Sequence, residues 1–151
     1  MEQIDNWITE AEELGEVAVD TETNSLDPHQ ADLVGVSLSS KIGKACYIPI
    51  GHKSNKCIEK DLVLKKLKPL LEDPSIKKIG QNIKFDFIVF FKHGINMTSM
   101  EDTMLMSYVL DAGKNRHNMD TLSEIHLNHK TISFKDLVGT GKKEINFSEV
   151  D

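Results

Sequence analysis

The apolar run Val17-Ala18-Val19 ends at two acidic residues, Asp20 and Glu22, which a single residue separates. Successive side chains of a β-strand alternate between its two faces, so a strand here places both carboxylates on one face. Paired carboxylates attract a hard cation such as Mg²⁺, which completes its coordination with water and phosphate. A second interpretation stays open, in which the strand ends in a solvated acidic turn that Asn24 and Ser25 would suit.

The segments that follow predict a mixed sheet. Short connections join three strand-like segments, 17–20, 33–38 and 45–50, a pattern typical of an antiparallel meander. A helix over 58–71 leads to a fourth strand over 76–80, and a strand reached through a helix is most simply parallel to its neighbour. Helical spacing of apolar residues predicts further helices over 4–14, 81–94, 102–110 and 119–126. We therefore expect one α/β domain over residues 1–151.

The composition narrows the class of protein. The chain is 39% apolar and 28% charged, which is typical of a soluble globular domain. It has no signal-peptide pattern, and its apolar runs are too short to span a membrane, so we expect a cytoplasmic protein with no membrane partner. We also expect a monomer. The net charge of −6 argues against a protein that coats duplex DNA. It does not exclude an enzyme that holds a few nucleotides in one cleft, because bound metal reverses the local charge.

A second acidic position lies at another junction between a strand and a helix. Asp86 follows the predicted fourth strand within the segment Gln81–Asp86, and Asp102 stands where a helix N-cap is expected. The methionines nearby are predicted to fill the core; they are Met97, Met100, Met104 and Met106.

Several blocks of sequence resemble a known family. Asp20-Thr21-Glu22 at the end of a strand and Asn82–Asp86 at a strand-to-helix junction resemble the first two motifs of proofreading 3′–5′ exonucleases. Five further blocks resemble the exonuclease domain of bacterial DNA polymerase I, and together they extend the likeness over nearly the whole chain; they are residues 67–73, 78–82, 102–108, 116–122 and 129–134.

The resemblance implies a fold, a reaction and a metal site. The fold would be ribonuclease H-like, with an antiparallel meander extended by parallel strands and flanked by helices. The reaction would remove deoxynucleoside 5′-monophosphates from a single-stranded or frayed DNA 3′ end with two divalent ions, Mg²⁺ or Mn²⁺. By their match to the motifs, Asp20 would bridge both ions, Glu22 would hold the ion on the nucleophile side, and Asp86 would hold the other.

The same resemblance implies a set of residues that contact the DNA strand. Leu26 would wedge between the last bases, while Gln81, Asn82 and Phe85 would contact the terminal nucleotide. Arg116 and Phe134 would contact the strand further along. Without the resemblance, Leu26 and Phe134 could be ordinary core residues and Asn82 only a helix cap.

The sequence departs from the family pattern in one respect. The third motif, a tyrosine followed four residues later by an aspartate, is expected about ten residues beyond Phe147, and no Tyr-x-x-x-Asp occurs among the 151 residues. We therefore expect a C-terminally incomplete exonuclease domain, inactive or slow alone, whose parent protein carries a covalently linked polymerase domain. Two alternatives stay open: a single-strand-binding module without hydrolysis, and an RNA-trimming exonuclease of the ribonuclease D type.

Overall fold

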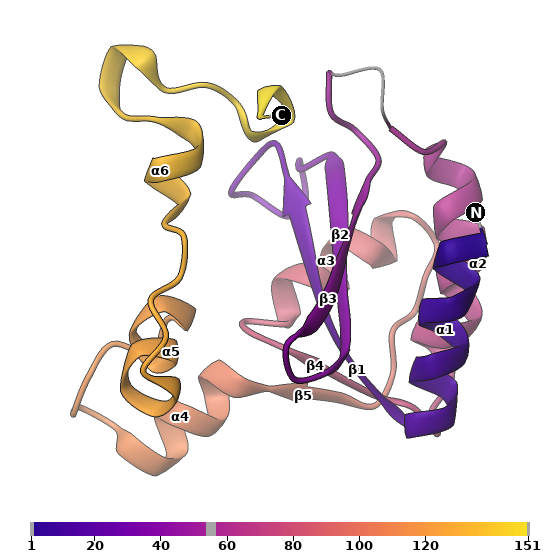
Figure 1. Cartoon of the computed structure of the whole chain (residues 1–151), viewed down its shortest axis with the longest axis horizontal. Coiled ribbons are helices and arrows are strands. Elements are labelled where there is room, and N and C mark those ends of the chain that lie inside the picture. The colour runs from indigo at the N-terminus through magenta and orange to yellow at the C-terminus, as the bar shows by residue number, and fades with distance from the viewer. Residues whose placement is uncertain (1, 54–56, 151) are drawn as a thin grey trace.

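A five-stranded mixed sheet forms the centre of the computed structural model, which describes residues 2–53 and 57–150 (Figure 1). The strands are β1 (Glu16–Thr23), β2 (Leu33–Lys41), β3 (Lys44–Pro49), β4 (Lys77–Gly80) and β5 (Met100–Asp102), in the order β3-β2-β1-β4-β5. The first three pair antiparallel, while β4 and β5 extend the sheet in parallel. The predicted meander with a parallel extension is therefore confirmed.

Two features of the sheet differ from the sequence predictions. Strand β1 continues through Thr23, because residues 20–23 pair with β2, so the interpretation of Asp20 and Glu22 as a turn is wrong. Strand β5 was not predicted, since it has three residues and its last residue, Asp102, is also the N-cap of the next helix. The N-cap prediction for Asp102 is confirmed, with its carboxylate accepting from the Met104 amide.

Three helices cover one face of the sheet and bury the core: α1 (Glu2–Leu14), α2 (Lys60–Glu72) and α3 (Lys84–Lys92). The inward face of β1 contributes Val17 and Val19, and α2 contributes the fully buried Leu67, Leu70 and Leu71. Helix α1 ends at Gly15, whose φ of +72° favours glycine and whose amide donates to the Ala11 carbonyl. This packed half of the molecule is the scaffold that fixes β1.

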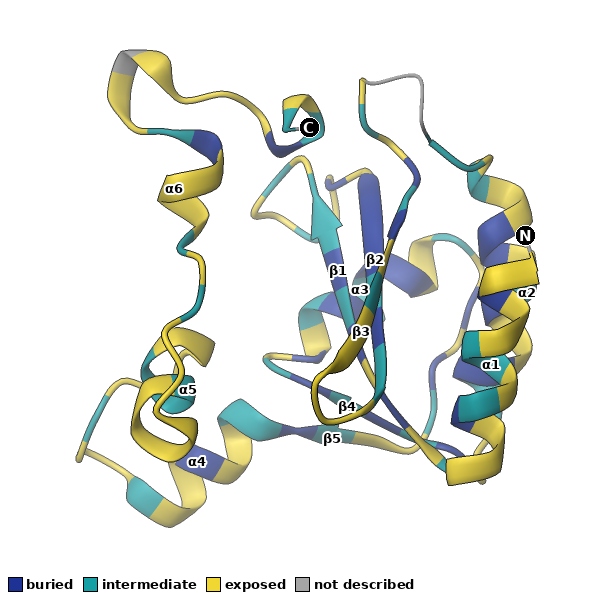
Figure 2. Cartoon of the chain, in the orientation of Figure 1, coloured by how far each residue is buried: buried dark blue, intermediate teal, exposed yellow. Residues whose placement is uncertain are grey.

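The C-terminal third of the chain lies on the other side of the sheet and is far more exposed (Figure 2). It contains α4 (Thr103–Asp111), α5 (Met119–Leu127), α6 (Phe134–Val138) and two short 3₁₀ turns, η1 (Gly141–Lys143) and η2 (Phe147–Glu149). Helix α5 has no buried residue, and Ser107 is the buried residue of α4. No helix in the described part of the chain is long and apolar enough to cross a membrane.

The prediction that the four methionines fill the core is only partly right. Met97 is buried, with 2% of its surface exposed, but Met100 and Met106 are 40% and 43% exposed. Met100 lies on β5 at the edge of the sheet, and Met106 lies on α4, so neither position is covered by a further layer of structure.

Replacing Leu67 tests the packing of α2. We expect Leu67→Ala to lower the free energy of unfolding by about 2–5 kcal/mol, because it leaves a cavity in the fully buried core. Leu62→Ala on the same helix is the matched control: its side chain is exposed, so the loss should stay below about 1 kcal/mol. Denaturant unfolding monitored by circular dichroism measures both values, and equal losses would contradict the burial described here.

Candidate active site

Strand β1 presents Asp20 and Glu22 on one face of the sheet. Val19 and Thr21 are buried on the opposite face, while the two acids between and beyond them are only half-buried. In the ladder with β2, Asp20 lies opposite Ser37 and Glu22 opposite Gly35. The period-2 alternation of a strand therefore places both carboxylates as predicted, on the side away from α1 and α2.

Asp86 reaches the same strand from the first turn of α3. Pairing between β1 and β4 covers Glu16 to Ala18, so the edge of β1 has no β4 partner further along. There the Asp86 Oδ1 atom accepts two hydrogen bonds from Thr21, at 2.8 Å from the amide and 2.6 Å from the hydroxyl. The Asp86 carboxylate thus takes the place of a strand partner, and it brings a third acid to Asp20 and Glu22.

Burial raises the pKa of all three carboxyl groups, and neighbouring charges add to the rise at Glu22 and Asp86. Burial raises the pKa of Glu22 to about 7, with further contributions from the charges of Asp20 and Asp86. Burial also raises the pKa of Asp86 to about 7; the hydrogen bond from Thr21 opposes this rise and the charge of Asp20 adds to it. Burial likewise raises the pKa of Asp20. The site therefore concentrates negative charge that a bound cation would stabilise.

The donor set fits a hard divalent ion. In the described part of the chain, no hydrogen bond or ion pair engages the carboxylate of Asp20 or Glu22, and Asp86 uses only Oδ1 in its two side-chain hydrogen bonds. Among residues 2–53 and 57–150, no three acidic, histidine or cysteine side chains close into a ready-made metal cage. An open set of carboxylates suits Mg²⁺, which usually keeps water and substrate phosphate among its ligands.

A groove of about 690 Å³ begins at Glu22 and joins three of the predicted strand-contacting residues, Leu26, Phe85 and Phe134. Leu26 is 94% exposed and Phe134 is 52% exposed, so the alternative of ordinary core residues is wrong for both. None of the described residues that line the groove is lysine or arginine. The groove therefore offers apolar surface beside the carboxylates and no cationic side chain.

The remaining predicted residues have different surroundings. Gln81 lines a smaller pocket with Asp20, but its amide donates to the His117 carbonyl and accepts from the Thr103 hydroxyl. Asn82 is exposed with a φ of +59°, and Ile83 is the N-cap residue, so Asn82 is not the helix cap. Arg116 is exposed in the loop between α4 and α5 and does not line the groove.

Sequence reasoning missed the supporting role of Thr21 and one of the two roles of Asp102. Thr21 lies between the two acids of the motif and holds Asp86, and its only sequence signal is that central position. Asp102 accepts hydrogen bonds from the amides of Asn82, Ile83 and Met104, so it fixes the turn before α3 as well as the start of α4. The N-cap pattern identified only the second of these two roles.

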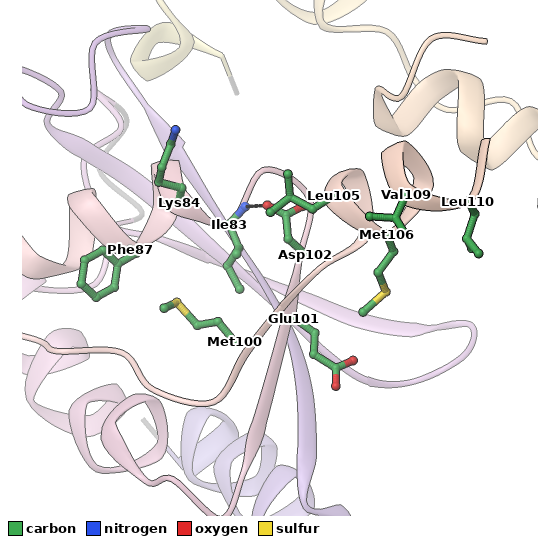
Figure 3. Close-up of a pocket in the computed structure, with 10 residues that line it drawn as sticks. All are labelled: Ile83, Lys84, Phe87, Met100, Glu101, Asp102, Leu105, Met106, Val109 and Leu110. Atoms are coloured by element: carbon green, nitrogen blue, oxygen red, sulfur yellow. Dashed lines mark hydrogen bonds between the residues drawn. The ribbon is translucent and has the colours of Figure 1, made fainter. Parts of the chain in front are cut away.

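A second groove, of about 700 Å³, lies between α3, β5 and α4 (Figure 3). Its lining is mostly apolar, with Phe87, Met100 and Leu105 among the side chains drawn, and the hydrogen bond from Ile83 to Asp102 lies beside it. It contains none of the predicted site residues. The groove at Glu22 is therefore the candidate active site.

The raised pKa of Glu22 predicts a pH-dependent gain of stability when its charge is removed. Above pH 7 this carboxyl is ionised in both the folded and unfolded chain, and only the folded chain bears the cost of the buried charge. In a metal chelator at pH 8, Glu22→Gln should therefore raise the free energy of unfolding by about 1 kcal/mol, given solvent screening of this partly exposed group. At pH 4 the gain should vanish, since the carboxyl is protonated in both states. The exposed Glu12→Gln on α1 is the control, and a loss of stability in Glu22→Gln at pH 8 would contradict the repulsion described.

Comparison with known proteins agrees with this geometry. The family model described as 3′–5′ exonuclease matches residues 1–150. DNA polymerase I of Rhizobium leguminosarum is 44% identical over 170 residues, which covers 98% of this chain and 16% of that protein. The chain thus spans about a sixth of the length of that relative.

Solved structures confirm the predicted ribonuclease H-like fold. Brucella melitensis NrnC with bound Mg²⁺ has a TM-score of 0.64 and 28% identity, over 90% of this chain and 66% of that one. Escherichia coli RNase D has a TM-score of 0.65 over 90% of this chain and 34% of that one, but at 19% identity it supports the fold alone. On the match to the family model over nearly its full length, the chain belongs to the 3′–5′ exonuclease family of DNA polymerase I.

Proposed function

We propose that this chain, as part of a longer protein, hydrolyses the last phosphodiester bond at the 3′ end of single-stranded or frayed DNA and so releases deoxynucleoside 5′-monophosphates, using two divalent ions, Mg²⁺ or Mn²⁺. The observation that carries the proposal is a cluster of three carboxylates, one of which, Glu22, lines a groove with exposed apolar side chains. Family membership supports the exonuclease reaction, and the similarity to DNA polymerase I supports DNA as the substrate.

Asp20, Glu22 and Asp86 are the residues that would hold the ions. When bound, the ions supply Lewis-acid stabilisation of the charge that develops at phosphorus during an in-line displacement. Thr21 fixes Asp86 by its two hydrogen bonds, so that one oxygen of this carboxylate remains available to a ligand. Because the Asp86 carboxylate is already oriented by these hydrogen bonds, it needs little rearrangement when a metal ion binds.

The groove would hold the last nucleotides through their bases. Leu26 would wedge between bases, Phe85 and Phe134 would contact their faces, and none of these contacts depends on base identity. The Asn82 side chain is exposed and would contact the terminal nucleotide. The Gln81 side chain would contact the same nucleotide, and its hydrogen bond to His117 also supports the loop that contains Arg116. Arg116 would then contact the phosphate backbone beyond the groove.

The chain would work within a longer bacterial protein that also contains a polymerase domain, since it matches only 16% of a DNA polymerase I. The third motif of the family does not occur among the 151 residues. We propose that residues 1–151 form the exonuclease domain without this motif, that the domain acts as a monomer in the cytoplasm, and that it hydrolyses DNA slowly when isolated.

Digestion of a labelled single strand tests this function. With Mg²⁺ or Mn²⁺, a longer polymerase that contains this sequence should release monophosphates from DNA rapidly, and the 151-residue chain should do so slowly or not at all. Asp20→Ala in the longer protein should reduce the rate by more than the 10- to 100-fold loss typical of outer-shell changes. A matched RNA strand distinguishes the ribonuclease D type of activity.

Three outcomes of this digestion would contradict the proposal. Rapid release by the 151-residue chain would show that the third motif is not needed. Undiminished release by Asp20→Ala would refute the metal assignment, and preference for RNA would refute the DNA substrate.

Thr21→Val tests whether the hydroxyl of Thr21 positions Asp86. Valine keeps the branched shape of the strand residue but removes the 2.6 Å hydrogen bond, so we expect a rate about tenfold lower and a higher Mg²⁺ requirement in the longer protein. Thr21→Ser retains a hydroxyl and should restore most of the rate. If valine and serine gave equal rates at matched thermal stability, the hydroxyl would have no role in positioning Asp86.

A further inference from the structure

The far wall of the groove is a segment from the C-terminal end of the described chain. We call residues 144–150, which include η2, the strap; its residues Glu144, Ile145, Asn146 and Phe147 line the groove together with Leu26. Figure 1 shows the strap passing close to the ends of β1 and β2. Its attachment to the sheet therefore decides the shape of the groove.

Both ends of the strap are hydrogen-bonded to loops that follow strands of the sheet. Near its start, the Asn146 side-chain amide donates to the Asn24 carbonyl at 3.2 Å, beside the end of β1. Near its end, the Lys53 amide donates to the Ser148 carbonyl at 2.8 Å, and the Lys53 ammonium pairs with Glu149. The ion pair is exposed and contributes little, so the backbone contacts provide most of the attachment.

His52 makes the most specific of these contacts. Its Nδ1 atom lies 2.9 Å from the Val150 carbonyl oxygen, and its Nε2 atom lies 2.5 Å from the Tyr47 hydroxyl. Because a carbonyl only accepts, Nδ1 must donate, and in the neutral ring Nε2 then accepts from Tyr47. One imidazole thus joins strand β3 to the last described residue of the strap.

Tyr47 anchors this link beside the site. Its ring lies across Gly35, where an added Cβ atom would lie 2.0 Å from the Tyr47 hydroxyl oxygen. Gly35 is the ladder partner of Glu22. The link from Tyr47 to His52 therefore begins on β3, where the Tyr47 ring reaches across the neighbouring β2 at Gly35, a position that only glycine leaves open.

Ring contacts continue the link into the groove. The His52 ring lies 5.8 Å from the ring of Phe147, and the Phe147 ring lies 5.9 Å from that of Phe134 at an interplanar angle of 11°. Phe147 is buried with Val34 and Val138, whereas half of Phe134 is exposed in the groove. The orientation of the exposed Phe134 ring therefore depends on Phe147, and that of Phe147 on His52.

We propose that His52 is a positioning residue for single-strand binding, which holds the strap so that Phe134 presents its ring to a base of the substrate. This inference rests on the proposed function, because it assumes that the groove holds a DNA strand. His52 lines neither the groove nor the carboxylate site, so its loss should weaken binding of the strand and leave the turnover number unchanged.

Hydrogen exchange in the free 151-residue chain tests the link without DNA. In His52→Ala, protection of the Lys53 amide should fall at least tenfold, since its acceptor Ser148 belongs to the strap, while the core amide of Val36 should be unchanged. Unchanged protection of the Lys53 amide would refute the link. Equal loss at Val36 would mean general unfolding and would also refute the specific role of His52.

Binding of a short fluorescein-labelled oligothymidine in a metal chelator tests the consequence. His52→Ala should weaken binding about tenfold, which corresponds to the loss of one modest base–aromatic stack. His52→Asn keeps a donor but no ring against Phe147, and His52→Phe keeps a ring but no donor, so each should lose only part of the affinity. His129→Ala, at an exposed histidine after α5, is the control and should bind like the original chain.

The outcomes separate the two proposals. If the original chain binds the strand and His52→Ala binds equally well, the positioning role is refuted and the proposed function stands. If the longer protein releases no monophosphates from any strand in the digestion described above, the proposed function is refuted, and the binding role of His52 falls with it. In the longer protein, a lower turnover number with unchanged KM in His52→Ala would also refute positioning of the strand.

Discussion

The structure depends on the double hydrogen bond from Thr21 to Asp86. Strand β4 ends before β1 does, so the amide of Thr21 would be buried without a partner if Asp86 were absent. A buried amide without an acceptor is costly, and a buried carboxylate without donors is costlier still. Each group satisfies the other, and in doing so they fix α3 against the one strand that carries Asp20 and Glu22. The contact that completes the edge of the sheet is therefore also the contact that assembles the acidic site.

The two sides of the groove differ in how much buried packing supports them. On one side, β1 and Phe85 rest on the packed core of α1, α2 and α3. On the other, the strap and α6 share only the small cluster of Val34, Val138 and Phe147, joined by the partly buried Val150. Regions with few buried contacts open at low free-energy cost, so the strap side is the one that a bound strand can adjust. The carboxylates, by contrast, belong entirely to the rigid side.

The sequence allowed much of the sheet to be predicted, because connection length and helix placement restrict strand direction. The common face of Asp20 and Glu22 followed from the alternation of a strand alone. The position of Asp86 beside these two residues could not be predicted in the same way, because the sequence does not show that β4 ends before β1. Only the family resemblance indicated that Asp86 belongs to the site. Strand β5 was not predicted because three residues are too few to show the alternation of apolar and polar side chains that indicates a strand. The exposure of Leu26 and Phe134 was also beyond reach, because an apolar residue has the same pattern whether it fills a core or faces a ligand.

The lining of the groove also bears on which DNA ends the proposed enzyme selects. With no lysine or arginine among its described lining residues, the groove has little to offer a phosphate backbone and much to offer an unstacked base. The bases of a correctly paired end already stack and pair within the duplex, so transfer to the groove brings them little benefit. A mismatched end has lost part of that stacking before it arrives. The selectivity for mismatched ends would then come from the free energy needed to unpair and unstack the last bases of the duplex, which is smaller at a mismatch. The protein itself need not recognise the mismatched base.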